Sequence, residues 1–227
     1  MGKFIAYFEI LCAVVLWGGS ATGADSAELT YYLDSREYNT ANVLTSVGNL
    51  PWGMNLWGFT DFHGEQKKAG QRFDLTRYFM EYRLRKSVDP HWVGGVQGMG
   101  VEFEYNDANG RGNQLLRFGL NYKRNVSLWS GVSGWLQGRV LPYETDGSGQ
   151  QLSLIHFLSL GSRLTLAGFS DWNLNNSASD RWVAESQASY RMSSVLSVVL
   201  EVRYNGYEQA HVALDGLGIA VGISAKH

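Results

Sequence analysis

Charged side chains recur at every second position in several stretches of this sequence. Between residues 77 and 85 all the charges fall on odd-numbered positions, and the even-numbered positions hold Tyr78, Met80, Tyr82 and Leu84. Alternate residues of a β-strand point to the same face, so each such stretch has one polar and one apolar face. The charged residues that we expect to line a shared, enclosed polar space are Arg77, Glu81, Arg83, Arg85, Glu102, Glu104, Arg117, Lys123, Arg139, Glu185, Arg191, Glu201 and Arg203.

Charges of both signs on facing strands are expected to pair, because an isolated buried ion is costly. Two roles fit such a set of charges. In the first, the ion pairs are structural and hold a narrow barrel together. In the second, they form a charged constriction that selects solutes, and an excess of basic groups would then favour anionic or dipolar solutes.

Aromatic side chains are expected on the same polar face. Trp57, Phe59, Trp129 and Trp135 are the candidates. Their rings could stack against the nucleobase or sugar ring of a solute. The alternative is that they simply pack against glycines of the same face.

Residues for covalent or metal chemistry are sparse. The one cysteine, Cys12, lies in the N-terminal apolar segment, and no His-x-Ser pattern of the kind used by outer-membrane lipases occurs. His156 shares a face with leucines, which indicates either a place near a membrane interface or a shifted register. Asp61 and His63 are two potential ligands, too few for a metal site. We expect no catalytic residue, no metal and no cofactor, and we do not expect an enzyme.

Period-two alternation dominates the chain beyond residue 28. The predicted strands are long, because a soluble strand averages about 5–6 residues whereas a tilted membrane-spanning strand needs about 9–11. The fold class is therefore all-β. The strands are expected at 28–35, 41–48, 52–62, 73–86, 96–106, 114–123, 126–141, 151–160, 163–173, 180–191, 195–206 and 214–225.

The connections between these strands alternate in length. Short joins at 49–51, 124–125, 161–162 and 192–194 alternate with longer polar segments, although the join at 87–95 is also somewhat long. Short turns at one end and longer loops at the other are typical of transmembrane barrels. The sequence therefore predicts an antiparallel up-and-down barrel of about twelve strands, with ten as the alternative. Both termini would lie on the periplasmic side.

The N-terminus predicts export. Lys3 precedes an apolar run that ends in small residues, the order of a signal peptide, which we place at residues 1–24 with the barrel at 25–227. A membrane anchor is the alternative. A formal charge of −2 offers no basic field for a nucleic acid polymer. We expect a bacterial outer-membrane location, with membrane lipids and the barrel-assembly machinery as partners. The ending Ile223 to His227 departs from the aromatic ending of many such barrels.

The segment 49–62, NLPWGMNLWGFTDF, resembles the early hairpin of nucleoside-specific, Tsx-like outer-membrane channel proteins. Those proteins carry a similar turn, a Trp/Gly–aromatic pattern and a twelve-stranded barrel. The resemblance covers about 15 residues together with the strand count. It implies a narrow channel for small polar molecules and assigns no site residue.

Three functions follow from these observations, in order of preference. The first is an outer-membrane channel that passes small polar solutes, with nucleosides as a specific possibility. The second is a closed structural barrel with an ion-paired lumen and no transport. The third is a barrel enzyme that modifies lipid.

Overall fold

The computed structural model describes residues 26–66, 75–109, 114–145, 149–174, 180–207 and 215–226. Nearly all of these residues belong to twelve strands, which range from 9 to 16 residues in length. The strands are β1 (Ser26–Asp34), β2 (Tyr38–Leu50), β3 (Met54–Glu65), β4 (Arg77–Ser87), β5 (Met99–Ala108), β6 (Gln114–Trp129), β7 (Val132–Glu144), β8 (Gln150–Leu160), β9 (Leu164–Leu174), β10 (Arg181–Arg191), β11 (Leu196–Asn205) and β12 (Gly216–Lys226).

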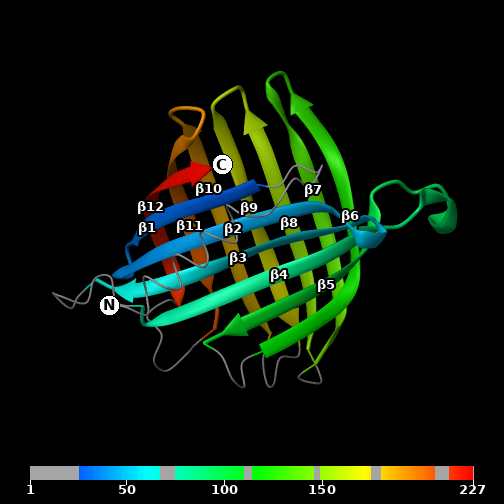
Figure 1. Ribbon diagram of the computed structural model, residues 1–227, viewed down its shortest axis with the longest axis horizontal. Coiled ribbons are helices and arrows are strands. Elements are labelled where there is room, and N and C mark those ends of the chain that lie inside the picture. Colours follow the sequence, from blue (N-terminus) through cyan, green and yellow to red (C-terminus); the bar gives the residue numbers. More distant parts are fainter. Residues whose placement is uncertain are drawn as a thin grey trace.

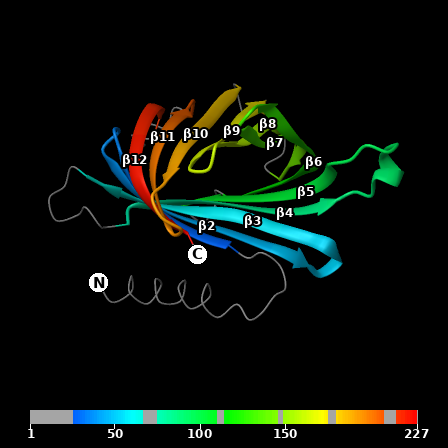
Figure 2. The same ribbon diagram turned by 90° about the horizontal axis from the view of Figure 1, so that it is seen from above.

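The strands form a single closed barrel in which every strand pairs with its neighbours in the sequence. The first and last strands close it, with Glu28 opposite Lys226 and Asp34 opposite Ala220. Figure 1 shows blue β1 beside red β12, and Figure 2 shows the strands curving into a ring. The predicted antiparallel up-and-down barrel is confirmed, with twelve strands rather than ten.

The two ends of the barrel differ in their connections. At the end where β1 begins and β12 ends, which we call the termini end, the joins are 51–53, 88–98, 130–131, 161–163 and 192–195. At the opposite loop end they span 35–37, 66–76, 109–113, 145–149, 175–180 and 206–215. The predicted alternation holds with two exceptions. The β1–β2 join is short, and the β4–β5 join contains a 3-10 helix, η2 (Pro90–Val93), that projects from the barrel (Figure 1).

Burial in this barrel is inverted relative to a soluble protein. Along β11, Val198, Leu200 and Val202 are each more than 40% exposed, while Val199 and Glu201 between them are buried. The other strands repeat this pattern, with aliphatic and aromatic side chains outside and mostly polar ones inside. An apolar band around a polar interior is the arrangement of membrane barrels.

The strand boundaries agree with the predictions except at β6 and β7. We predicted a tight turn at Arg124 and Asn125, but β6 continues to Trp129 and the turn lies at residues 130–131. A run of polar residues resembles a turn in sequence. The chain actually reverses at Gly131, whose φ of 82° suits glycine. Similarly, Trp52 lies in the 3-10 turn η1 (Pro51–Gly53) and not in β3.

The predicted signal peptide at residues 1–24 lies outside the described residues, as do the centres of several predicted external loops. In the described part of the chain, no helix is long and apolar enough to cross a membrane.

Candidate functional site: a vestibule and a charge network in the lumen

The termini end of the barrel contains a cavity of about 910 Å³, which we call the vestibule. Its wall includes Ser26 and Lys226, near the ends of the described chain, and residues 161–163 and 193–195 of two turns. These positions place its mouth at the termini end. The volume lies within the usual range of small-molecule sites, roughly 300–1,000 Å³.

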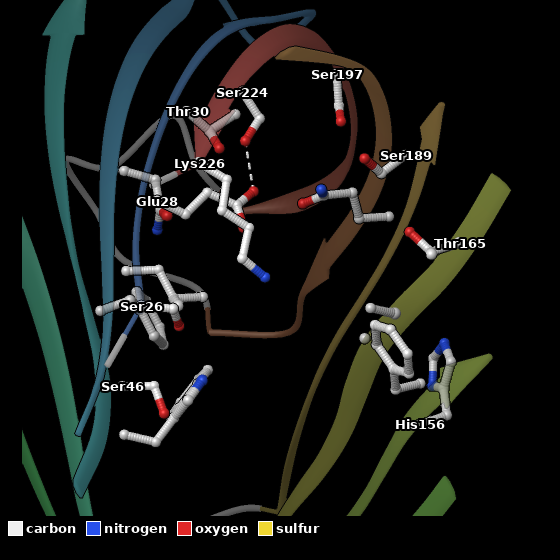
Figure 3. A pocket seen from close by; sticks show the side chains of 18 of the residues that line it. Ser26, Glu28, Thr30, Ser46, His156, Thr165, Ser189, Ser197, Ser224 and Lys226 are labelled. Atoms are coloured by element: carbon white, nitrogen blue, oxygen red, sulfur yellow. Dashed lines mark hydrogen bonds between the residues drawn. The ribbon is translucent and has the colours of Figure 1, made fainter. Parts of the chain in front are cut away.

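Hydroxyl groups supply much of the polar surface of the vestibule. Thr30 and Ser224 project from the closing strands, and Thr165, Ser189 and Ser197 project from β9, β10 and β11 (Figure 3). A hydroxyl both donates and accepts hydrogen bonds, so this wall can contact alcohol, carbonyl and oxyanion groups alike.

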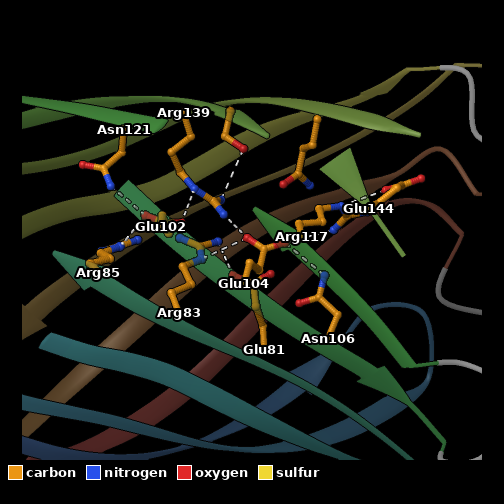
Figure 4. Close-up of polar contacts among 12 residues, drawn as sticks. Glu81, Arg83, Arg85, Glu102, Glu104, Asn106, Arg117, Asn121, Arg139 and Glu144 are labelled. Carbon is orange, nitrogen blue, oxygen red and sulfur yellow. Dashed lines mark hydrogen bonds and ion pairs between the residues drawn. The ribbon is translucent and has the colours of Figure 1, made fainter. Parts of the chain in front are cut away.

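Beyond the vestibule, ion pairs occupy the lumen beside β4–β7. We call the eight residues involved the charge network: Glu81, Arg83, Arg85, Glu102, Glu104, Arg117, Arg139 and Glu144 (Figure 4). Their positions on four adjacent strands follow from the alternation of the sequence, which turns every second side chain inward.

Glu102 and Glu104 are the anionic centre of the charge network. Glu102 accepts a hydrogen bond from Arg85 Nε at 2.6 Å and forms an ion pair with Arg139, whose Nε lies 2.6 Å from Glu102 Oε1. Glu104 lies 2.9 Å from Arg117 Nη1 and 3.4 Å from Arg83 Nε, and it also pairs with Arg139. Each carboxylate therefore faces at least two guanidinium groups.

The charge network is deeply buried and reaches across the lumen. Glu102 and Glu104 are 0% exposed and Arg139 is 2% exposed. Arg117 also donates from Nη2 to Asn173 Oδ1 of β9, at 3.3 Å, so the contacts cross from β6 to a strand three places away. Side chains therefore span the lumen at this level. Such burial is tolerated only because nearly every charge has an opposite partner.

A second cluster connects β1 to β10 and β11 on the other side of β12. Arg203 pairs with Glu201 and lies 3.4 Å from Glu185 Oε2, and its guanidinium carbon lies 4.9 Å from the centre of the Tyr32 ring. The Tyr32 hydroxyl donates to Gln187 Oε1 at 2.7 Å. These contacts fix β1 against β10, across the site of barrel closure.

The thirteen predicted lumen residues all lie on the inner face. Seven of them belong to the charge network, and Glu185, Glu201 and Arg203 form the second cluster. Arg77 lies inside near the loop end, with its guanidinium 5.7 Å from the centre of the Tyr38 ring. Lys123 and Arg191 line the vestibule instead. The structure thus divides one predicted set among several places.

Three of the four predicted aromatic residues line the vestibule. Trp57 lies against Arg83 and Arg85, with guanidinium-to-ring distances of 4.8 and 5.8 Å. Phe59 contacts Trp57 edge to face. Trp135 stacks on Phe157 and carries Lys123 Nζ 4.0 Å above its ring.

Trp129 does not join them. It ends β6, beside an irregularity in the register with β7, and is 66% exposed. Trp129 is thus placed at the tip of β6, beside the turn at residues 130–131 and outside the vestibule wall.

Neutral polar residues are the part of the site that sequence reasoning missed. Asn121, Gln137, Gln151 and Asn173 are buried inside the barrel, and Asn173 connects Arg117 to Gln151. They share the inward parity of the charged residues, so the alternation could have identified them. The choice of charged residues alone excluded them.

His156 has the outward parity of β8, as the predicted register requires, and it is also one of the residues that line the vestibule (Figure 3). Its Nε2 is 3.3 Å from Ser186 Oγ, and the two residues lie in register on either side of Gly168. Ser186 lies midway along β10 between the outward-facing Trp182 and Tyr190. The pair therefore lies at mid-height of the wall, and neither an interfacial position nor a shifted register accounts for it.

Asp61 and His63 are both engaged by neighbouring side chains. Asp61 accepts from Asn42 Nδ2 at 2.7 Å, and His63 Nδ1 lies 2.9 Å from Thr40 Oγ1. Over the described ranges, no group of three or more His, Cys, Asp or Glu residues is placed to hold a metal ion.

No family model matches this chain, and no curated protein matches its sequence. Solved structures do match. The KdgM porin shares 13% identity with a TM-score of 0.53, over 88% of this chain and 98% of the porin. The NanC porin shares 11% identity with a TM-score of 0.52, over 89% and 99%. Outer membrane phospholipase A from Escherichia coli shares 14% identity with a TM-score of 0.52, over 88% and 92%.

These likenesses establish the fold. The chain has the architecture of outer-membrane barrels, over nearly the whole length of both chains compared. Porins and a phospholipase share this architecture, so the fold alone does not select a function. The function has to be argued from the lumen.

Proposed function

We propose that this protein is an outer-membrane channel that admits small polar solutes to the vestibule and passes them through the charge network. The observation that carries the proposal is the vestibule itself, a cavity of about 910 Å³ lined by hydroxyl, charged and aromatic side chains, inside a barrel whose outer face is apolar. A barrel with only a structural role has no need of an open chamber that presents hydroxyl groups and cations.

The proposed location follows from the outer face. Its exposed leucine, isoleucine, valine and aromatic side chains would be unfavourable in water but suit the hydrocarbon of a bilayer. Export by the signal peptide at residues 1–24 and insertion by the barrel-assembly machinery are parts of the same proposal. Membrane lipids would then contact the apolar band.

Nucleosides are the specific solute that this proposal names. Trp57 and Trp135 present rings to the vestibule, where a nucleobase could stack on them. Hydroxyl groups of Thr30 and Ser189 could bond the ribose. The resemblance of residues 49–62 to Tsx-like channels points to the same class of solute.

Single-channel recording in planar bilayers tests the proposal. We expect discrete conductance steps, reduced by uridine added on the vestibule side. Arg117→Ala should enlarge the conductance and lower the preference for anions, because it removes a cation whose hydrogen bonds cross the lumen. Arg124→Ala, on the outer face of β6 opposite the exposed Leu136, should leave both unchanged. Silence of wild type and Arg117→Ala over many insertions would overturn the proposal.

A closed structural barrel is the second candidate, and the burial of the charge network favours it. Glu102, Glu104 and Arg139 have almost no exposed surface, as expected of a permanent plug. Under this alternative, Arg117→Ala would lower stability while wild type and variant both remain non-conducting. The recordings described above distinguish the two candidates.

The expectation that this is not an enzyme stands as part of the proposal. Ser186 and His156 could form a nucleophile–base pair. However, Ser186 lies four residues from both Trp182 and Tyr190, at mid-depth of the proposed membrane span. The ester bonds of membrane lipids lie at the edges of a hydrocarbon layer about 30 Å thick. The pair is therefore displaced from the bonds that a lipid hydrolase would cleave.

A further inference from the structure

We propose that the vestibule selects solutes that carry an oxyanion group, a carboxylate or a phosphate, on a hydroxyl-bearing body. The inference rests on the proposed function only in treating the vestibule as a place that solutes enter. It differs from that function in its ligand, because a nucleoside carries no such charge.

Four cations on the vestibule wall lack an anionic partner. Lys123, Arg163, Arg191 and Lys226 all line the cavity, and within the described part of the chain no carboxylate forms an ion pair with any of them. Lys123 lies above the Trp135 ring, and Arg191 donates to the Ser162 carbonyl oxygen. The remaining arginines of the wall differ, because Arg83, Arg85 and Arg203 are all paired with glutamates.

The carboxylates of the vestibule wall are already engaged. Glu185 is close to Arg203, Asp61 accepts from Asn42, and Glu28 accepts from the Ser224 hydroxyl. Glu28 lies opposite Lys226 in the β1–β12 register, yet no ion pair joins them. Figure 3 shows the Lys226 side chain extending into the cavity. Among the described residues of the wall, seven cationic side chains therefore stand against three carboxylates.

The position of these cations determines the sign of the field at the entrance. Arg163 lies in the β8–β9 turn, Arg191 ends β10 and Lys226 ends β12, so all three lie at the mouth. Glu28 is the one carboxylate of the cavity wall at this level among the described residues. A confined cavity with cations at its mouth concentrates anions and repels cations.

The hydroxyl and aromatic residues of the vestibule wall suit the uncharged part of such a solute. Thr165, Ser189 and Ser197 present hydroxyl groups that can bond an alcohol or a second oxyanion oxygen. Trp135 lies on the same wall, with Phe157 stacked on its ring and Lys123 Nζ 4.0 Å above the ring centre. An oxyanion held by the cations would thus place an attached sugar or base ring near an aromatic surface.

Equilibrium binding to the folded protein in detergent tests this inference with two matched pairs of ligands, glucuronate with glucose and uridine monophosphate with uridine. We expect each acid to bind about tenfold or more tightly than its neutral partner, the effect of one charge-assisted hydrogen bond. Which acid binds tighter distinguishes a carboxylate from a phosphate ligand.

The variant Arg191→Gln/Lys226→Gln should abolish the preference for the acid. Arg181→Gln removes the same kind of charge at the loop end, outside the vestibule wall, and should preserve the preference for the acid.

Equal binding of acid and neutral partners, no binding of any ligand, or equal losses in the vestibule and Arg181→Gln variants would overturn the inference. Conductance recording keeps the two proposals apart, because a channel that conducts without preferring acids refutes only the inference, whereas acid binding without conductance refutes only the channel.

Discussion

Three guanidinium groups contact the carboxylate of Glu104, those of Arg83, Arg117 and Arg139. The carboxylate has no exposed surface, so water cannot replace a lost partner. Each arginine has one further glutamate, at 81, 144 and 102 respectively. Glu104 therefore neutralises part of the charge of three arginines at once. Among the residues of the charge network, its loss is expected to lower the free energy of unfolding most.

Glu104→Gln should lower the free energy of unfolding by about 3 kcal/mol, because removing one partner leaves buried charge without compensation. Urea unfolding in detergent micelles measures the change. Asp215→Asn, an exposed carboxylate beside the start of β12, serves as the control and should have little effect. An unchanged urea midpoint for Glu104→Gln would show that water reaches the network.

At the scale of elements, the wall of β8–β10 depends on a close approach at Gly168. A Cβ atom at this position would lie 2.8 Å from Ser186 Cα and closer still to the Glu185 carbonyl oxygen, both backbone atoms of the paired strand. Backbone atoms of a paired strand cannot move aside without disturbing the ladder. The same glycine lies between His156 and Ser186, whose side chains bond across it.

We expect Gly168→Ala to destabilise the barrel by about 1–3 kcal/mol, the usual cost of forcing a methyl group into a packed site. Gly138→Ala is the matched control, since a Cβ there meets nothing within 4 Å and its φ is not positive. The heat-dependent change of mobility in SDS gels, which separates folded from unfolded barrels, would compare the two. Equal behaviour of both variants would contradict the close approach.

At the scale of the whole molecule, the apolar band of the outer face predicts that the cost of a charged substitution depends on its depth in the membrane. Leu200 lies midway along β11 and Leu196 at its termini end, and the two are 49% and 47% exposed. Because the two side chains are similarly exposed, a difference in stability between substitutions at the two positions would come from the surrounding lipid or water and not from packing within the barrel.

In lipid vesicles, Leu200→Arg should cost about 2–4 kcal/mol of folding free energy, whereas Leu196→Arg should cost about 0–1 kcal/mol. The reason is that a cation at the middle of a bilayer loses its hydration while one near the interface keeps it. Unfolding by urea from vesicles gives both values. Equal costs for the two variants would place the barrel outside a membrane.

The barrel could be predicted from the sequence because its determinants are local. Alternation assigns each side chain to a face, and the length of polar segments between strands fixes the two ends. These features recovered twelve strands, most boundaries within a few residues, and the inward direction of residues such as Glu102 and Arg139. The errors came where local signals conflict, as at residues 124–125, where polar residues continue a strand and Gly131 makes the turn.

Which inward residues meet one another is decided only by the tertiary structure. Parity places Arg77, Arg117 and Arg191 on the same inner face, but strand register and closure send them to the loop end, the charge network and the mouth. Arg117 reaches Asn173 at 56 residues' separation, and His156 reaches Ser186 across an intervening strand. Contacts between side chains on opposite sides of a closed barrel depend on the register of all the strands together, which no single segment of sequence specifies. The sequence therefore determined a barrel with a charged interior, and its closure decided which charges pair with one another and which face the vestibule unpaired.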